Sequence, residues 1–457
     1  MGRLFGTDGI RGVANADLST ELVDRVARAA VHVLAPGRRG RIAIGRDPRI
    51  SGDLLEAQFA AGLCSAGADA IRLGVLPTPG VALLARRLGV DAGVVISASH
   101  NPVEDNGIKF FAPTGFKLPD AVEDEIERLM ESAAGLTRPS GTAVGRITDV
   151  PDAPEQYLEF LAGHAHARLD GWRVVVDCAN GATSALAPGL WERLGATVTA
   201  ICARPDGTNI NAGCGSTHPE VVAEAVVRAG ADLGFAHDGD GDRAIAADRH
   251  GHVVDGDAIM GIAALHRDAR GALPGRAIVA TVMTNLGLEV VLRGAGIRIE
   301  RARVGDRYVL ERMLETGLTL GGEQSGHVIF LDHATTGDGL LTAVQIANVM
   351  LETGRSLDDL AARFHRYPQV LLNVRVQAPD RWVDDPEILA AVARADRHLG
   401  ERGRVLVRAS GTERLVRVMT ECETATEAES LARELADLVA ARLGGAVVVR
   451  SGVLEAK

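Results

Sequence analysis

The chain contains three stretches of similar design: GVDAGVVISASHNP (89–102), GADLGFAHDGDGDR (230–243) and GLTLGGEQSGH (317–327). Each starts at a glycine, continues through a short apolar run and ends in a polar motif. Short apolar strands resemble one another by chance, but here the most unusual polar motif of each region falls at the same point. We therefore interpret the three stretches as the third strand of a unit that occurs three times.

The strands that precede these stretches support the repeat. They are short runs rich in Val and Ile, and helical patterns separate them, which is typical of α/β layers with most strands buried on both faces. The first strands are RIAIGRD (41–47), RVVVDCANG (173–181) and AIVATVMTN (277–285), and the second are AIRLGVLPTP (70–79), TVTAICARPDG (197–207) and IRIERARVGDR (297–307). Because ligands bind at the carboxyl ends of strands in open α/β sheets, the three polar motifs could face one shared cleft.

The last part of the chain, from about Tyr367, has a different pattern. Its apolar runs, NVRVQAP (373–379), RVLVRASGTERLVRVMTEC (404–422) and AVVVR (446–450), indicate an α+β domain with an antiparallel sheet. The predicted fold class is therefore three similar mixed-sheet α/β/α domains followed by a smaller α+β domain, arranged around a central cleft. Boundaries near Pro151, Gly251 and Tyr367 divide the 457 residues into domains at 1–150, 151–250, 251–366 and 367–457.

The composition narrows the class of protein. Hydrophobic residues make up 46% and charged residues 24%, which is ordinary for a folded, soluble chain. The formal net charge of −11, with no basic tract, disfavours nucleic acid or an anionic membrane as a partner, although an anionic small substrate stays possible. The N-terminus has no apolar run long enough for a signal peptide or a membrane span, so a cytoplasmic location is expected.

The five cysteines give little indication of a site. They are odd in number, widely scattered and without a CxxC pair: Cys64, Cys178, Cys202, Cys214 and Cys422. This distribution disfavours a zinc site or a disulfide framework and favours reduced thiols in a cytosol.

The motif HDGDGDR has the features of a metal-binding loop. Asp238, Asp240 and Asp242 alternate with glycines, which allow the tight turns that bring three carboxylates to one centre. Repelling anions in an all-oxygen set suit Mg²⁺ or Ca²⁺. An EF-hand is excluded because Arg243 stands where that loop needs Gly and Arg249 where it needs Glu. A solvated acidic turn is the alternative.

The motif SASHNP places Ser99 at the end of its strand. Taken alone, Ser99 is as well explained as the cap of a following helix. Phosphorylation would instead add negative charge and three acceptor oxygens, one of which would be a natural ligand for a metal held by the aspartates. The chain has no GxSxG elbow, so an α/β-hydrolase triad has no support.

Three further motifs contain groups suited to a phosphosugar. Glu323, Ser325 and His327 in GGEQSGH suit sugar hydroxyls and proton transfer, although a simple polar turn explains them equally well. In RASGTERLVR (408–417), backbone N–H groups and two arginines suit a phosphate dianion, with a plain hairpin turn as the alternative. Arg11 in GTDGIRG and Lys109 in DNGIKFF add cations for a transferring phosphoryl group.

Together these motifs provide a nucleophile, a metal, a sugar-binding turn and a second phosphate site. A phosphatase needs only the first two, whereas a second phosphate site is useful when the substrate carries two phosphates at some stage.

Five motifs, GTDGIRG, SASHNP, DGDGDR, GGEQSGH and RASGT, follow the order of the α-D-phosphohexomutase superfamily, which the chain resembles over essentially its whole length. The resemblance implies a heart-shaped protein of four domains, a monomer or homodimer. Within the superfamily, GTDGIRG, ISASHNP and GGEQSGH look most like the bacterial members that act on glucosamine phosphates.

The resemblance also implies roles for individual residues. Ser99 is the phosphorylated serine, and it holds one Mg²⁺ per chain together with Asp238, Asp240 and Asp242. Arg11 and Lys109 surround the transferring phosphoryl group, and His327 lies near the reacting hydroxyl. The implied substrate-binding residues are His100, Arg243, Arg307, Glu323, Ser325, Arg408, Ser410, Gly411, Thr412 and Arg417.

The implied reaction is phosphoryl transfer from Ser99 to glucosamine 6-phosphate, reorientation of the 1,6-bisphosphate and release of glucosamine 1-phosphate, an amino-sugar precursor of the cell wall. Glucosamine or glucose 1,6-bisphosphate would act as activator. The alternatives are a member of the superfamily specific for mannose or glucose phosphates and, more distantly, a non-catalytic sugar-phosphate sensor. One departure is visible: the phosphate loop reads SGTER where the family usually has SGTEP, so Arg414 replaces a proline.

Overall fold

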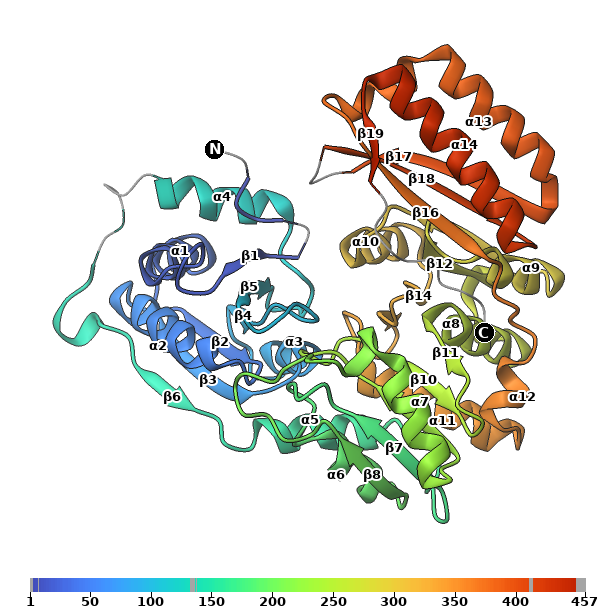
Figure 1. Ribbon diagram of the computed structural model, residues 1–457. Coiled ribbons are helices and arrows are strands. Elements are labelled where there is room, and N and C mark those ends of the chain that lie inside the picture. The colour runs from blue at the N-terminus through green and yellow to red at the C-terminus, as the bar shows by residue number, and fades with distance from the viewer. Residues whose placement is uncertain (1–2, 7, 132–135, 137, 411–413, 449–457) are drawn as a thin grey trace. The chain divides into compact units, whose positions relative to one another are not determined.

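The computed structural model describes residues 3–6, 8–131, 136, 138–410 and 414–448. The chain forms two compact units (Figure 1). The first consists of Met1–Met283 with Ile297–Ala362, and the second of Thr284–Gly296 with Arg363–Lys457. None of the helices in the described ranges has the length and apolar character needed to span a membrane.

The first sheet of the first unit has six strands in the order β1-β5-β4-β2-β3-β6. Strands β2, β3, β4 and β6 are parallel, whereas β5 is antiparallel to both β4 and β1. The strands are β1 (Ile10–Val13), β2 (Arg41–Arg46), β3 (Asp69–Val75), β4 (Ala92–Ile96), β5 (Asp105–Phe111) and β6 (Ile147–Asp149). The helices are α1 (Thr20–Leu34), α2 (Ile50–Ser65), α3 (Thr78–Arg87) and α4 (Asp120–Glu131), with a 3₁₀ turn η2 (Gly141–Ala143).

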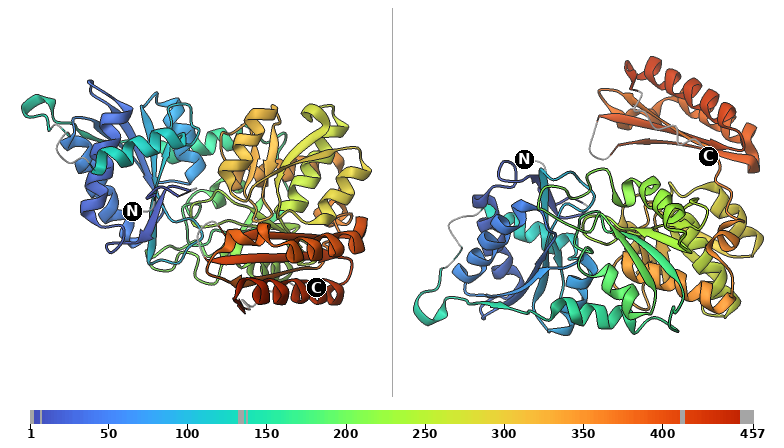
Figure 2. Two further views of the ribbon diagram at one scale, coloured as in Figure 1. Left: turned by 90° about the horizontal axis from the view of Figure 1, so that it is seen from above. Right: turned by 60° about the horizontal axis from the view of Figure 1, so that its bottom comes forward.

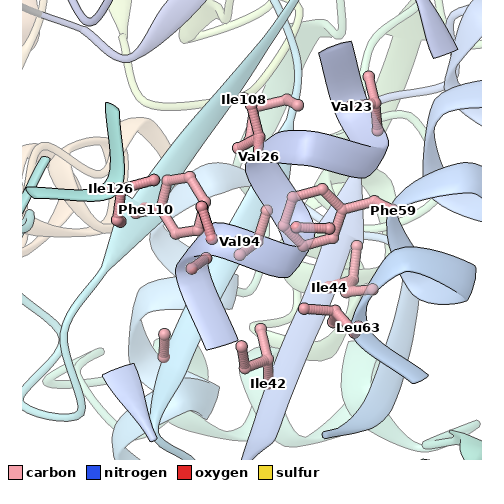
Figure 3. Packing of buried hydrophobic residues seen from close by; sticks show 14 of the residues in the cluster. Val23, Val26, Ile42, Ile44, Phe59, Leu63, Val94, Ile108, Phe110 and Ile126 are labelled. Carbon is pink, nitrogen blue, oxygen red and sulfur yellow. The ribbon is translucent and has the colours of Figure 1, made fainter. Parts of the chain in front are cut away.

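Alternation along the strands explains how both faces of this sheet are covered. Ile42 and Ile44 of β2 join an apolar cluster with α1, α2 and α4, part of which Figure 3 shows around Phe59 and Phe110. Ala43 and Gly45 alternate with the two isoleucines along β2 and lie on the other face of the sheet, toward α3. A Cβ on Gly45 would lie 2.4 Å from the side chain of Val81 in α3, so only glycine allows this approach.

The second and third sheets repeat the same plan. Their orders are β11-β10-β9-β7-β8 and β13-β12-β14-β15. In each sheet a first strand (β2, β7, β12) pairs in parallel with the next two, and an antiparallel strand follows the third. The threefold repeat inferred from the sequence is therefore confirmed.

The elements of the second sheet are β7 (Arg173–Asp177), β8 (Thr197–Ile201), β9 (Leu233–Ala236), β10 (Ile245–Asp248), β11 (Val253–Val254), α5 (Ala153–Ala162), α6 (Ala187–Arg193), α7 (Pro219–Ala229) and η3 (Gly215–Thr217). Those of the third are β12 (Ala277–Thr281), β13 (Arg298–Ala302), β14 (Leu320–Gly322), β15 (Val328–Phe330), α8 (Gly256–Ala269), α10 (Asp306–Thr316), α11 (Gly339–Thr353), α12 (Leu357–Ala361) and η4 (Pro274–Arg276).

The glycine that opens each of the three quoted stretches has the same structural role. Gly230 and Gly317 directly follow the ends of α7 and α10, and Gly89 follows the end of α3 after one residue. Their φ angles are 56°, 69° and 60°. A left-handed residue after a helix satisfies the last carbonyl groups, and glycine adopts this conformation without strain. The repeated glycine therefore ends one helix and starts the strand that leads to the polar motif.

The second unit contains an antiparallel sheet of the order β17-β18-β16-β19. Its core consists of apolar residues from the sheet and two helices, which lie on one side of the sheet (Figure 2). The elements are β16 (Gln369–Arg375), β17 (Gly403–Ala409), β18 (Leu415–Cys422), β19 (Ala446–Val448), α13 (Pro386–Leu399), α14 (Ala425–Leu443), η5 (Pro379–Asp384) and η6 (Gly400–Arg402). This α+β unit agrees with the expectation for the end of the chain.

Helix α9 (Leu286–Gly294) belongs to the second unit although it follows a strand of the third sheet in sequence. Asn285 caps it and also donates from Nδ2 to the carbonyl oxygen of Tyr367 at 2.9 Å. The N–H of Leu286 donates to the carboxylate of Glu421 at 3.1 Å. These buried polar contacts explain why the helix groups with the C-terminal sheet.

Candidate active site

Ser99 lies in the turn between β4 and β5, and it is 2% exposed. Its Oγ donates to Oδ2 of Asp238 at 2.5 Å. Asp238 follows β9, the strand of the second sheet that corresponds to β4, so the repeat brings the two polar motifs together. The chain enters β5 rather than a helix after Ser99, and the helix-cap interpretation is therefore wrong. Its φ of 52° is uncommon for a residue with a side chain.

A buried polar network holds the turn of Ser99. Its carbonyl oxygen accepts hydrogen bonds from Arg49 Nη2 at 2.9 Å and from Asn211 Nδ2 at 2.8 Å. Arg49 also pairs with Asp47, and neither side chain has any exposed surface. Ser97 connects Asp47 to the turn of Ser99. Its Oγ donates to Asp47 Oδ2 at 2.5 Å and accepts from the N–H of Ser99 at 3.0 Å.

The three aspartates of the second motif converge as predicted. Asp238, Asp240 and Asp242 are buried, and each has a carboxylate oxygen within 4.8 Å of the others. Burial, together with the neighbouring carboxylates, raises the pKa of Asp238 well above its usual range. Oδ1 of Asp240 and Oδ1 of Asp242 have no hydrogen-bond partner among the described residues. Buried, unsatisfied oxygens in an all-oxygen set fit a hard divalent cation, so these residues could hold a metal ion.

Lysine residues neutralise part of this negative charge. Lys109 Nζ lies 2.9 Å from Oδ2 of Asp240 and 2.9 Å from Oδ2 of Asp8. Lys117 Nζ contacts Asp8 Oδ1 at 2.7 Å, and Arg11 also pairs with Asp8. Burial alone would raise the pKa of Asp8, but the cations of Lys109 and Lys117 lower it well below its usual range. Asp8 thus holds three cations beside the aspartate cluster.

His327 lies between two carboxylates at the edge of the same group. Its Nδ1 is 3.5 Å from Asp242 Oδ2, and its Nε2 is 3.8 Å from Asp306 Oδ2. Burial lowers the pKa of His327, but the two carboxylates outweigh burial and raise it to about 9. The N–H of Gly337 donates to Nε2 at 3.1 Å, however, which requires a lone pair on that nitrogen. The resting geometry therefore favours a neutral ring with its proton on Nδ1, and a doubly protonated ring would lose this bond.

A cavity of about 460 Å³ opens beside these residues. Its lining includes seven of the predicted site residues: Arg11, Ser99, His100, Asp242, Arg243, Glu323 and His327. Burial, with the positive charges of Arg243 and Arg11, lowers the pKa of His100 to about 4, so its ring is neutral at pH 7. Glu323 accepts a hydrogen bond from the N–H of Gly305 at 3.0 Å, which fixes it on the wall.

Five predicted residues of the first unit do not line this cavity: Lys109, Asp238 and Asp240, which belong to the network described above, and Arg307 and Ser325. Arg307 is buried and donates from Nη2 to both carboxylate oxygens of Glu123, at 2.9 and 3.0 Å. It also pairs with Asp120. This bond joins α10 to α4, which explains its burial without a substrate. Ser325 lies in the predicted turn, and its Oγ has no hydrogen-bond partner among the described residues.

The predicted phosphate loop belongs to the second unit. Arg408 of β17 and Arg417 of β18 are directly opposite each other in the antiparallel ladder. Burial, with the charge of Arg417, lowers the pKa of Arg408. Like charges at opposed positions destabilise a sheet, and a bound dianion would remove that cost. Ser410 donates its N–H to the carbonyl oxygen of Leu415 at 2.8 Å, while Gly411 and Thr412 lie outside the described residues.

Several residues of the site were missed from the sequence. Asp8 and Asp306 lie within the stretches GTDGIRG and IRIERARVGDR, and both contact Lys117. Thr78 donates to Asp240 Oδ2 at 2.6 Å from the start of α3. A polar residue beside glycine was the available signal for the two aspartates, but no periodicity identifies Lys117.

Models of the Phosphoglucomutase/phosphomannomutase family match almost the whole chain. The alpha/beta/alpha domains I, II and III match residues 2–135, 155–251 and 255–367, and the C-terminal domain matches residues 371–438. A relative named phosphoglucosamine mutase, from Desulforamulus reducens, is 54% identical, over 96% of this chain and 99% of its own length.

Solved structures show the same fold. A phosphoglucomutase/phosphomannomutase family protein from Burkholderia thailandensis is 25% identical and has a TM-score of 0.83, over 97% of this chain and 99% of its own. The N-acetylphosphoglucosamine mutase of Aspergillus fumigatus, solved in complex with GlcNAc-6P and magnesium, has a TM-score of 0.69 at 18% identity, over 95% of each chain.

Proposed function

Because this chain belongs to the Phosphoglucomutase/phosphomannomutase family, we propose that it interconverts glucosamine 6-phosphate and glucosamine 1-phosphate, the reaction of a phosphoglucosamine mutase. Membership confirms the resemblance inferred from the five motifs. The choice of glucosamine over mannose or glucose rests on the 54% identical relative of that name.

The observation that carries the proposal is the bond from Ser99 Oγ to Asp238. It places a hydroxyl on the wall of the cavity and against the aspartate cluster, which Lys109 contacts through Asp240. A phosphoryl group on that oxygen would have cations on one side and the cavity on the other. This is the arrangement that phosphoryl transfer requires, since its catalysis depends on positioning and charge stabilisation.

In the forward reaction, the bond between Ser99 Oγ and phosphorus breaks as the C1 oxygen of glucosamine 6-phosphate bonds to phosphorus. The hydroxyl proton passes to a neighbouring base, for which neutral His327 is the candidate. The bisphosphate then turns around, its 6-phosphoryl group returns to Ser99, and glucosamine 1-phosphate leaves. Glucosamine or glucose 1,6-bisphosphate would act as activator by phosphorylating Ser99.

Asp238, Asp240 and Asp242 would hold one Mg²⁺ together with a phosphoryl oxygen on Ser99. The fungal mutase of the same fold was solved with magnesium, and the unsatisfied oxygens of the triad suit that ion. Bound Mg²⁺ would neutralise the charge that develops on the transferring group. Arg11 and Lys109 would contribute positive charge from the side of the first sheet.

The remaining residues that we propose to bind the substrate form two groups. His100, Arg243, Glu323 and Ser325 would bind the sugar and its reacting phosphate. Arg408, Ser410, Gly411, Thr412 and Arg417 would hold the phosphate that is not being transferred. Arg307 keeps a proposed substrate role only if its pairing with Glu123 opens during turnover.

We place the protein in the cytoplasm as a monomer or homodimer whose partners are phosphosugars rather than nucleic acid or membranes, consistent with its net charge of −11. The division into domains at 1–150, 151–250, 251–366 and 367–457 is part of the same proposal.

A parallel assay of glucosamine, mannose and glucose 6-phosphates tests the function. We expect the highest kcat/KM for the glucosamine substrate and no mutase activity in Ser99→Ala. A higher kcat/KM for either neutral sugar would replace the glucosamine assignment. Full activity of Ser99→Ala would refute the phosphoserine mechanism.

A further inference from the structure

A second group of metal-ligating side chains lies in the second sheet, apart from the aspartate triad. Asp177 ends β7, Cys202 directly follows β8, and Cys214 precedes η3. A ligand atom from each lies within 4.8 Å of the other two. Strands β7 and β8 are parallel with Asp177 opposite Ile201, so the sheet itself brings the first two residues together.

The carboxylate of Asp177, like that of Asp338, is buried without a cation in contact among the described residues. Its side chain has no exposed surface, and no ion pair among the described residues includes it. Asp47, equally buried, has Arg49 as its partner. The oxygens of Asp177 accept hydrogen bonds from the N–H of Ala179 and the N–H of Gly215, each at 2.9 Å, and from the Cys202 thiol, all of which are neutral donors. A buried carboxylate in this state lacks the charge compensation that such groups normally have.

The two thiols complete a set of donors with mixed chemistry. The Cys202 thiol interacts with the carboxylate of Asp177 and with the Cys214 thiol, and Cys214 is buried. Two sulfur ligands and one oxygen ligand suit a thiophilic divalent cation rather than Mg²⁺. Ligands around a tetrahedral zinc ion lie about 3.5–3.8 Å apart, which the observed spacing allows after small side-chain movements.

We propose that Asp177, Cys202 and Cys214 bind one divalent cation of the zinc class. On binding, the S–H bonds of the two cysteines break, both protons go to solvent, and each sulfur forms a bond to the cation. The carboxylate of Asp177 becomes the third ligand, and a water molecule fills the fourth position. The cation supplies the positive charge that the buried carboxylate lacks.

This site would act on the catalytic centre through the segment between the two cysteines. Asn211 lies in that segment, and its Nδ2 donates to the carbonyl oxygens of Ser99 at 2.8 Å and Asn101 at 3.0 Å. A cation bound to Cys202 and Cys214 would fix both ends of the segment. It would thereby stabilise the turn that presents Ser99, without touching the substrate.

Titration of the reduced, metal-free full chain with Co²⁺ tests the proposal. We expect one equivalent to produce the sulfur-to-cobalt charge-transfer absorption in the near ultraviolet, which oxygen ligands do not give. Asp240→Asn should keep this absorption, because it alters only the aspartate triad. Cys202→Ser and Cys214→Ser should lose it, whereas the control variants Cys64→Ser and Cys422→Ser should keep it.

A second measurement on the unmodified chain makes the test independent of how the variants fold. One equivalent of Zn²⁺ should slow alkylation of Cys202, leave alkylation of Cys64 unchanged and raise the thermal midpoint. Absence of the absorption in the folded wild type, or its survival in the double cysteine variant, would refute the site. A Cys202–Cys214 disulfide in the purified chain, with no metal bound after reduction, would also refute it and assign the pair to thiol oxidation.

Discussion

Replacement of Arg49 by methionine should test how the turn of Ser99 is held. Arg49 has no exposed surface, pairs with Asp47 at 2.9 Å and donates to the carbonyl oxygens of Ser99 and Asn101 at 2.9 and 2.8 Å. Removing one partner of a buried ion pair costs about 3–5 kcal/mol. Asn211 still donates to both carbonyl oxygens, so they add little to this cost. For a unit of about 350 residues the loss corresponds to a thermal midpoint lower by ~4–7 °C.

The pH dependence of the stability loss in Arg49→Met distinguishes the effect of breaking the ion pair from the effect of lost packing. Burial already raises the pKa of Asp47 despite the Arg49 charge, and without Arg49 it rises further. A carboxyl group whose folded pKa is raised stabilises the fold below its unfolded pKa, and this contribution is lost as pH rises through the folded pKa. Arg49→Met should therefore be destabilised less at pH 4 than at pH 7.

The control is Arg249→Met in the same unit. Arg249 is 44% exposed and pairs with Asp358 at 3.0 Å, and loss of a surface ion pair costs about 0–1 kcal/mol. Thermal unfolding of both variants at pH 4 and pH 7 gives the comparison. An Arg49→Met midpoint within 2 °C of Arg249→Met, with roughly the same deficit at both pH values, would refute the reasoning about the buried pair.

Four further outcomes follow from the site. Intact-mass measurement of the purified chain should show a fraction with one added phosphate that Ser99→Ala lacks; the same mass shift in the variant would place the phosphate elsewhere. Asp240→Ala should lose mutase activity. It should also lose about 1–3 kcal/mol of stability, because Lys109 keeps Asp8 as an ion-pair partner while Thr78 loses its buried hydrogen-bond acceptor. Asp240→Asn should lose activity with a smaller loss of stability, and equal stability of both variants would contradict this. Burial raises the pKa of Asp338 to about 7. The stability of Asp338→Asn relative to the wild type should therefore increase as the pH rises from 4 to 8. A stability difference that stays constant over this range would contradict the raised pKa of Asp338. Calorimetry should show tighter Mg²⁺ binding to the chain phosphorylated on Ser99 than to the unphosphorylated chain, and equal affinities would exclude a phosphoryl ligand.

The strand ends were predictable because a parallel sheet has a strict geometry. The repeat predicted that SASHNP and HDGDGDR occupy equivalent strand ends, and the bond between Ser99 and Asp238 confirms that inference. Three aspartates separated by single glycines could also be assigned to one centre. They lie in one short loop, whose geometry depends little on distant parts of the chain.

Long side chains and distant segments were not predictable in this way. Arg307 follows a strand end, yet its guanidinium reaches Glu123 in α4, and nothing in its local sequence indicates which way it extends. The cysteines were dismissed because no CxxC pair was present. Cys202 and Cys214 meet Asp177 only through the register of β7 and β8 and the path of the connecting segment, neither of which the spacing reveals.

The charges of the catalytic centre explain why phosphate and metal belong together there. Five carboxylates and four cations meet in it: Asp8, Asp238, Asp240, Asp242 and Asp306, with Arg11, Lys109, Lys117 and Arg243. The protein alone is thus close to neutral, with one excess negative charge. A phosphoryl group on Ser99 adds about two negative charges, and a divalent cation offsets them. A phosphoryl group alone would raise the excess to about three negative charges, and a divalent cation alone would leave about one positive charge. Uncompensated charge among buried groups is costly. The side chains therefore couple the two additions, and the affinity for the cation depends on the phosphorylation state of Ser99.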